Sequence, residues 1–256
     1  MQILHHITMS IKKQVPNIIT LLNLFCGCIA VYFACHNKIG LAALFTALGI
    51  FFDFFDGFFA RIFNAQSELG LQLDSLADMV TSGVVPGVVM FQLLKNSNLI
   101  SDFIPIEVIG WEDQVAWWSF LGFAITLASC YRLANFNIDT RQTTSFIGLP
   151  TPANTLLILS IGLISMYQPE NFIGQFLNNT WILLLITALS CYLLNAEIRL
   201  FALKFKSWGW KENWIRYLFL VSSIALIVLF KYTGVVLTIL LYVVLSLIFE
   251  REKTTV

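Results

Sequence analysis

The hydrophobic positions of this 256-residue chain fall into eight long runs separated by short polar segments. Each run is close to the roughly 17 to 25 residues that an α-helix needs to cross a bilayer. The pattern therefore predicts an all-α polytopic membrane protein with about eight transmembrane helices. The predicted spans cover residues 16-36, 39-62, 71-94, 115-137, 151-168, 180-205, 214-231 and 234-249.

A different pattern precedes the first run. Ile3, Leu4, Ile7 and Ile11 recur at helical spacing, while the charged side chains lie mostly on other faces. This predicts a short amphipathic helix over residues 1-15 that lies on the membrane surface. The run that follows lacks a convincing small-residue cleavage site, so we interpret it as the first span and not as a removable signal peptide.

Composition supports a membrane location. Hydrophobic residues make up 58% of the chain and charged residues only 12%, about half the usual share in soluble proteins. The net charge is zero, so only the placement of charges is informative. The five cysteines are an odd number and lie in or beside apolar runs, which argues against a disulfide framework.

The lysines and arginines predict the orientation, because cytoplasmic loops carry an excess of them. With the N-terminus inside, only Lys38, Lys95 and Lys231 fall outside. This distribution favours both termini on the cytoplasmic side of the cell membrane. The inside positions are Lys12, Lys13, Arg61, Arg132, Arg141, Arg199, Lys204, Lys206, Lys211, Arg216, Arg251 and Lys253.

Four aspartates interrupt the second and third runs. An uncompensated Asp in a membrane helix costs roughly 2.5 to 3.5 kcal/mol, so a compensating partner is expected. Asp53 and Asp56 share one helical face, as do Asp74 and Asp78 on the next helix. If the two helices pack antiparallel, the four carboxylates converge in one pocket on the cytoplasmic side. Small residues that allow close approach of a backbone or ligand lie at Gly57, Ala60 and Gly70.

Carboxylates without His or Cys suit hard cations, which here would be Mg²⁺ or Mn²⁺. Two such ions can hold a pyrophosphate for an in-line displacement, so phosphoryl transfer is the leading hypothesis. Two alternatives remain at this point. The acids could pair with arginine or line a water-filled cavity, or they could serve a cation or proton transporter. Against transport, the acids cluster at one membrane face and form no relay across it.

The aspartate spacing resembles the signature of the CDP-alcohol phosphotransferase family, D-x2-D-G-x2-A-R-x8-G-x3-D-x3-D. Its fixed positions are met by Asp53, Asp56, Gly57, Ala60, Arg61, Gly70, Asp74 and Asp78. The resemblance implies that Asp53, Asp56 and Asp74 bind two divalent metal ions. It also implies that Asp78 acts as general base or helps to position the attacking hydroxyl. We count all four carboxylates as candidate metal ligands.

The same resemblance implies a binding site for CDP-diacylglycerol. Gly57, Ala60 and Gly70 would border the cytidine nucleotide, and Arg61 would lie near the donor phosphates. Asn17, Thr20 and Asn23 share a face of the first span. They could line the nucleotide pocket, or they could form hydrogen bonds between helices.

Other stretches resemble the bacterial phosphatidylserine synthase branch of the family. They are PNIITLLNLFCG at 16-27 and CYRLANFNIDT with FIGLPTPAN within 130-154. Asn135 stands where the pattern of that branch has a second basic residue. Arg132 could bind the carboxylate of serine or a phosphate, or could only mark the end of a span. Pro150 is a further acceptor candidate, although a proline here could simply start the next helix.

The resemblance implies a domain organisation and a reaction. A six-helix catalytic core would occupy 16-205, followed at 206-256 by a cytoplasmic loop, two more transmembrane helices and a short cytoplasmic tail. The reaction would transfer the phosphatidyl group from CDP-diacylglycerol to L-serine, giving phosphatidylserine and CMP. Related enzymes use glycerol phosphate, inositol phosphate or an archaeal-type donor, and members of the family are commonly homodimers. Membrane lipid is the expected surrounding, and nothing suggests nucleic-acid binding.

Overall fold

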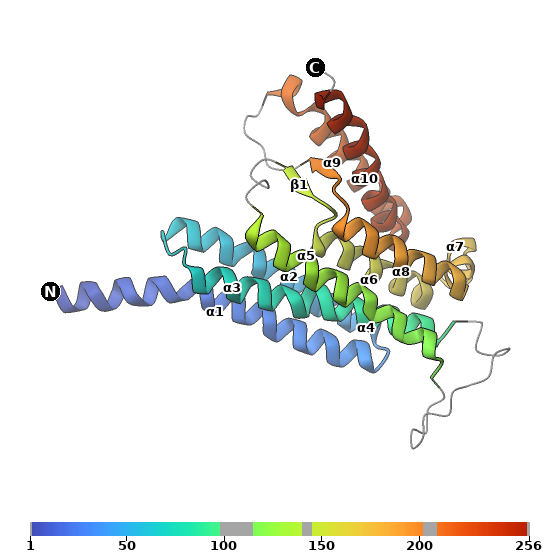
Figure 1. Cartoon of the computed structure of the whole chain (residues 1–256), viewed down its shortest axis with the longest axis horizontal. Helices are drawn as coiled ribbons and strands as arrows, with labels where there is room; N and C mark the ends of the chain where they lie inside the picture. The colour runs from blue at the N-terminus through green and yellow to red at the C-terminus, as the bar shows by residue number, and fades with distance from the viewer. Residues whose placement is uncertain (1, 98–114, 140–144, 202–208, 255–256) are drawn as a thin grey trace.

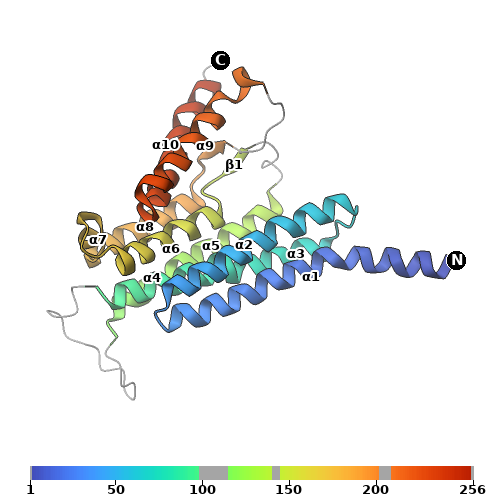
Figure 2. The same cartoon turned by 180° about the vertical axis from the view of Figure 1, so that it is seen from behind.

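The computed structural model describes residues 2–97, 115–139, 145–201 and 209–254 of the chain. Helices α1 to α8 lie roughly along one direction as an elongated bundle, and a hairpin of two further helices leans away from it at a steep angle (Figures 1 and 2). The elements are α1 (Gln2–Cys35), α2 (Ile39–Ile62), α3 (Glu68–Asp78), η1 (Met79–Val84), α4 (Val85–Lys95), η3 (Trp117–Phe123), α5 (Ala124–Ile138), β1 (Ser145–Ile147), α6 (Thr151–Tyr167), α7 (Phe172–Leu177), α8 (Thr180–Asn195), β2 (Arg199–Phe201), α9 (Trp210–Phe230) and α10 (Tyr232–Thr254).

The predicted fold class, an all-α polytopic membrane protein, is confirmed. In the described part, Gln14–Cys35, Ile39–Ile62, Glu68–Lys95 and Asn213–Phe230 are long and apolar enough to span a bilayer. Shorter apolar helices cover Thr151–Tyr167, Thr180–Asn195 and Tyr232–Ile248. The remaining predicted span, 115-137, holds η3 and α5. Each predicted apolar run therefore overlaps a helical segment.

The buried core lies where α4 and α6 pack together, with α1, α2 and α8 around them. Val89, Met90 and Ile158 are almost completely buried there. By contrast, large apolar side chains such as Phe51, Phe54 and Phe58 are exposed along α2. An apolar outer face of this kind is what a bilayer covers. The five cysteines are free thiols, in agreement with the predicted lack of a disulfide framework.

The first helix is continuous from Gln2 to Cys35 and contains Pro16. The predicted surface helix at 1-15 is thus joined to the first span without a break, and its free end extends beyond the rest of the bundle (Figure 1). Its location on a membrane surface stays a prediction, as does the division of the chain at 205. That boundary falls outside the described residues.

A π-helical segment, Met79–Val84, interrupts the third span directly before Pro86. Proline has no N–H to donate to the carbonyl four residues earlier, which here belongs to Ser82. The Thr155 hydroxyl on α6 donates a hydrogen bond to that carbonyl at 2.9 Å. A side chain from another helix thus satisfies the acceptor that Pro86 leaves open.

The predicted span at 180-205 is too long, because α8 ends at Asn195 and the chain continues into β2. β2 pairs antiparallel with β1. Gly148 and Leu149, which follow β1, donate backbone hydrogen bonds to the carbonyls of Ile198 and Leu193 at 2.9 and 2.8 Å. The last turn of α8 is therefore bonded to another segment, and the apolar stretch after it extends as a strand.

Candidate active site

Three aspartates from two helices converge near one end of the bundle. One carboxylate oxygen from each of Asp53, Asp56 and Asp74 lies within 4.8 Å of the other two. Asp53 and Asp56 share a face of α2 because they are three residues apart, and Asp74 approaches from α3. Asp56 is buried, while Asp53 and Asp74 are half-buried. We call these three residues the acid cluster.

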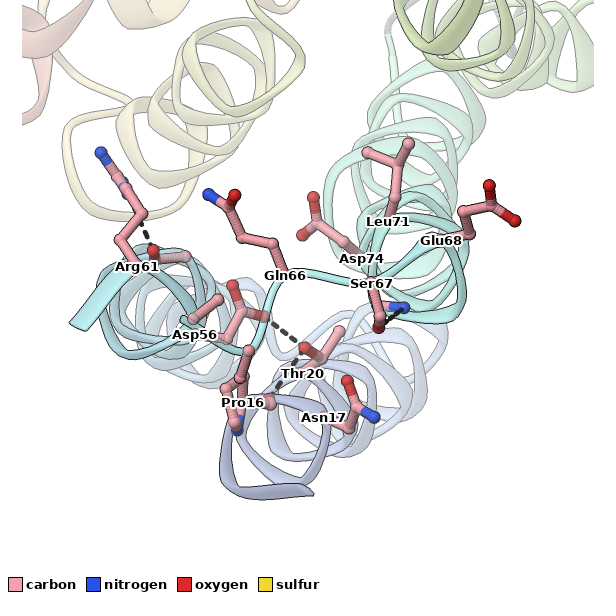
Figure 3. Close-up of a pocket in the computed structure, with 14 residues that line it drawn as sticks. Pro16, Asn17, Thr20, Asp56, Arg61, Gln66, Ser67, Glu68, Leu71 and Asp74 are labelled. Atoms are coloured by element: carbon pink, nitrogen blue, oxygen red, sulfur yellow. Dashed lines mark hydrogen bonds between the residues drawn. The ribbon is translucent and has the colours of Figure 1, made fainter. Parts of the chain in front are cut away.

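Helix α1 holds this arrangement from below. It packs against both α2 and α3, and Figure 3 shows it under the gap between them. The Thr20 hydroxyl is 2.6 Å from Oδ2 of Asp56 and donates a hydrogen bond to it. Because the same hydroxyl lies 3.0 Å from the Pro16 carbonyl, Thr20 is fixed at the point where α1 meets α2.

Asp78 lies one turn beyond Asp74 but is not among the three carboxylates that fall within 4.8 Å of one another. Its Oδ1 accepts a hydrogen bond from Nδ2 of Asn23 at 3.3 Å. Asp78 is half-buried, whereas Asn23 is completely buried. Of the four predicted metal ligands, the structure thus groups three and places the fourth next to them in a separate hydrogen-bonded environment.

A cavity of about 530 Å³ opens beside the acid cluster. It contains Asp56 and Asp74 in its wall, together with six of the seven residues predicted to bind the donor; Asn23 is the seventh and does not line it. The predicted residues in the wall are Asn17, Thr20, Gly57, Ala60, Arg61 and Gly70. The turn between α2 and α3 supplies a further part of the wall.

This turn adds residues that the sequence reasoning did not select. Ala65, Gln66, Ser67 and Glu68 line the cavity, as does Leu71 on α3. The Ser67 hydroxyl caps α3 by accepting a hydrogen bond from the Gly70 N–H at 3.0 Å. All of them fall in the spacers of the signature, Leu71 between Gly70 and Asp74 and the others between Arg61 and Gly70. The spacers leave the residue types open and so give no chemical indication.

Arg61 stands at the mouth of the cavity with an exposed side chain. Its Nε donates to the Gly57 carbonyl at 2.9 Å, which directs the guanidinium end away from Asp56 (Figure 3). In the described residues, therefore, the candidate phosphate-binding arginine does not pair with the acid cluster.

A second cavity, of about 340 Å³, lies between α5, the end of α8 and β1. Of the three predicted acceptor residues, Arg132 and Asn135 line this cavity, and Pro150 lines neither of the two. Pro150 instead precedes α6 as its N-cap residue. The other lining residues are Ile138, Asp139, Ile147, Leu194, Asn195, Ala196 and Glu197.

Arg132 is the buried cation of this second cavity. Its side chain is only 7% exposed, and its Nε has no hydrogen-bond partner in the described part of the chain. Arg132 lies close enough to Asp78 for the two charges to interact. A buried guanidinium with an unused donor is suited to bind an anionic ligand.

Ser75 and Asn137 connect the two cavities through the helices that carry them. Nδ2 of Asn137 on α5 lies 2.8 Å from the Ser75 hydroxyl on α3, and the hydroxyl lies 3.2 Å from Oδ1 of Asn137. Ser75 directly follows Asp74, so this pair couples the acid cluster to the helix of Arg132. Sequence spacing gave no indication of it.

The donor set fits a hard divalent cation, since three carboxylate oxygens from separate side chains lie within reach of one ion. Beside them, a cavity of about 530 Å³ with several small residues in its wall can hold a ligand of nucleotide size. The arrangement can therefore support chemistry on a phosphate ester.

Comparisons with known proteins agree with chemistry on a phosphate ester. A family model described as CDP-alcohol phosphatidyltransferase matches residues 13–193. A protein of Bacillus subtilis (strain 168) named CDP-diacylglycerol--serine O-phosphatidyltransferase is 36% identical over 154 residues, which are 58% of this chain and 76% of that protein.

Two proteins with the same name are less similar to this chain. The one from Helicobacter pylori (strain J99 / ATCC 700824) is 30% identical over 150 residues, or 56% of this chain and 55% of that protein. The one from Saccharomyces cerevisiae is 31% identical over 177 residues, or 61% of this chain and 56% of that protein. The chain thus spans little more than half the length of these two relatives.

Proposed function

Since this chain belongs to the CDP-alcohol phosphatidyltransferase family, we propose that it transfers the phosphatidyl group of CDP-diacylglycerol to L-serine. The products are phosphatidylserine and CMP. The observation that carries the proposal is the acid cluster of Asp53, Asp56 and Asp74 beside a cavity of about 530 Å³. The names of the B. subtilis, H. pylori and yeast relatives support serine as the acceptor.

We assign Asp53, Asp56 and Asp74 to hold two divalent ions, Mg²⁺ or Mn²⁺, with Asp78 at the edge of the same site. When bound, such ions neutralise the charge of the donor pyrophosphate and of the displaced CMP. The fit rests on three convergent carboxylate oxygens, a ligand type that hard cations prefer. Thr20 assists by fixing one oxygen of Asp56 with its hydroxyl.

The donor nucleotide occupies the cavity between α2 and α3 in this proposal. Gly57, Ala60 and Gly70 leave room for it because none carries a side chain larger than a methyl group. Arg61 faces the phosphates from the mouth. The acyl chains of the donor remain in the bilayer, along the apolar outer face of the bundle.

The acceptor enters through the second cavity. Arg132 binds the serine carboxylate with its buried guanidinium, and Asn135 lies at the exposed side of the same cavity. This places the serine hydroxyl toward Asp78, whose charge interacts with that of Arg132. Pro150 has no direct contact with substrate in this arrangement and begins α6.

The chemical step is an in-line displacement at the phosphatidyl phosphorus. Asp78 accepts the proton of the serine hydroxyl, whose oxygen forms the new bond to phosphorus. The bond between that phosphorus and the CMP oxygen breaks, and CMP leaves with its electron pair. The reaction needs no covalent intermediate on the protein.

The proposal includes a location and an assembly. The protein resides in the cell membrane with both termini and the active site on the cytoplasmic side, and it functions as a homodimer. The lysine and arginine distribution supports the orientation. Serine then reaches the site directly from the cytosol.

One assay tests the acceptor. The purified protein is given CDP-diacylglycerol and Mg²⁺ or Mn²⁺ together with serine, glycerol phosphate or inositol phosphate in turn, and CMP is measured. We expect CMP release with serine alone. Release of CMP with another alcohol would show that this alcohol, and not serine, is the acceptor. No release with any of them would favour the alternative of a cation or proton transporter.

A further inference from the structure

We propose that Asn23, itself held by Thr81, positions the Asp78 carboxylate for proton transfer. The three side chains form a short relay that joins helix α1 to the π-helical segment η1 and to the end of α3. The inference rests on the proposed function, in which Asp78 accepts the proton of the acceptor hydroxyl. In this inference Asn23 acts through Asp78 as a positioning residue and does not contact the donor.

The relay consists of two hydrogen bonds in sequence. Nδ2 of Asn23 donates to Oδ1 of Asp78 at 3.3 Å, and the Thr81 hydroxyl donates to Oδ1 of Asn23 at 2.8 Å. Asn23 and Thr81 are both completely buried. Since water does not reach either side chain, the protein alone determines how the amide is oriented.

The direction of the amide follows from donor and acceptor chemistry. An ionised carboxylate can only accept hydrogen bonds, so the amide nitrogen of Asn23 must face Asp78. The amide oxygen then faces away and needs a donor, which the Thr81 hydroxyl supplies. A valine at position 81 would keep the shape but leave this buried oxygen unbonded, and the amide would lose the bond that holds its orientation.

The packing around the relay leaves it little freedom. A Cβ added at Gly49 on α2 would lie 2.9 Å from Oδ1 of Asn23 and 2.8 Å from Cγ2 of Thr81. A Cβ added at Gly27 on α1 would lie 2.5 Å from the Thr81 hydroxyl. Helix α2 therefore approaches both side chains closely at Gly49, and α1 approaches Thr81 closely at Gly27, so an added methyl group at either glycine would collide.

The backbone explains why one asparagine can serve both partners. Asp78 ends α3 and Thr81 lies three residues later in η1, so both side chains face α1. Asparagine suits the position because it bonds a carboxylate without adding a charge. Its neutral donor fixes the direction of the Asp78 lone pairs and leaves the second carboxylate oxygen available for the acceptor hydroxyl.

The test compares Thr81→Val with Thr81→Ser in the purified full-length protein, using serine-dependent CMP release. Loss of an orienting contact of this kind costs about ten-fold or more in activity. We expect Thr81→Val to lower kcat by about ten-fold with an unchanged KM for CDP-diacylglycerol. Thr81→Ser keeps the hydroxyl and should stay close to the unaltered protein. Thr187→Val is the matched control, since Thr187 is a buried threonine whose hydroxyl donates to the Leu183 carbonyl of its own helix, α8, at 2.8 Å.

Gly49→Ala provides a second variant that changes no polar group. Its methyl should displace Asn23 and Thr81 and lower kcat, again without raising the donor KM. Full kcat in Thr81→Val, an equal loss in Thr81→Ser, or a parallel rise in donor KM would each overturn the relay. If the unaltered protein released no CMP with serine, the proposed function would fail and the catalytic role of the relay with it.

Discussion

Thr20 and Asn23 bond two different aspartates from one face of the same helix. Thr20 holds Asp56 of the acid cluster, Asn23 holds Asp78, and Asn17 lines the donor cavity one turn earlier. The structure thus shows bonding between helices at Thr20 and Asn23 and cavity lining at Asn17 and Thr20, while binding of the nucleotide by this face stays a prediction. In the proposed function, this single polar stripe on α1 would serve the metal site, the base and the nucleotide.

At the level of single residues, the acid cluster gives the strongest prediction. Asp53→Asn or Asp74→Asn should reduce metal-dependent CMP release at least about 100-fold, because each change replaces a charged ligand oxygen by a neutral amide. Activity is measured over a range of Mg²⁺ and Mn²⁺ concentrations. Glu170→Gln, beside α7 at the far end of the bundle (Figure 1), is the control and should leave turnover unchanged. Near-normal turnover in either aspartate variant would remove the two-metal proposal.

Arg132 gives a prediction that separates acceptor from donor. Arg132→Ala should raise the serine KM by roughly 10-fold or more, since a hydrogen bond to a charged group contributes about 1.5 to 3 kcal/mol. The KM for CDP-diacylglycerol should change far less, because Arg132 lines only the second cavity. Arg132→Lys keeps the charge but loses the planar guanidinium, so its serine KM should lie between those of the unaltered protein and of Arg132→Ala. An unchanged serine KM would contradict serine binding by Arg132 and would leave it as a residue that only marks the end of a span.

At the level of helices and strands, long hydrophobic runs were predictable and their interruptions were not. A run such as 39-62 is recognised directly from its apolar residues. Helical periodicity then predicts that aspartates three or four residues apart lie on one face of a helix. The end of α8 at Asn195 depends instead on hydrogen bonds to Gly148 and Leu149, which are distant in sequence. Of the second cavity, the sequence predicted only Arg132 and Asn135 on α5, because α5, α8 and β1 meet only in the folded chain.

Gly148 gives a prediction for this junction. Its φ is +73°, a conformation that side chains disfavour, and an added Cβ would lie 2.5 Å from the Leu194 carbonyl oxygen. Gly148→Ala should therefore lower the free energy of unfolding by about 1 to 3 kcal/mol and raise the serine KM, since Leu194 lines the second cavity. Thermal unfolding in detergent and steady-state kinetics measure the two effects. Gly209→Ala is the control, because nothing lies within 4 Å of that position, and an equal effect there would contradict the argument.

At the level of the whole molecule, the α9–α10 hairpin lies outside the segment matched by the family model. It is nevertheless attached to the core, since α10 packs against α6 and the Tyr242 hydroxyl donates to the Phe201 carbonyl at 2.9 Å. The hairpin thus supports β2 and the side of the molecule that holds the second cavity.

The orientation of the whole molecule decides which compartment supplies serine, and it can be measured directly. Gln66 lines the donor cavity in the turn between α2 and α3, whereas Lys38 lies in the turn between α1 and α2 at the other end of these helices. Both side chains are exposed. In a variant with all five cysteines replaced, a single Lys38→Cys should react with a membrane-impermeant maleimide on intact cells, and Gln66→Cys should react only after the membrane is opened. The two sites act as each other's control because one helix, α2, separates them. The opposite pattern would place the acid cluster outside and would require both serine and the metal ions to come from that side.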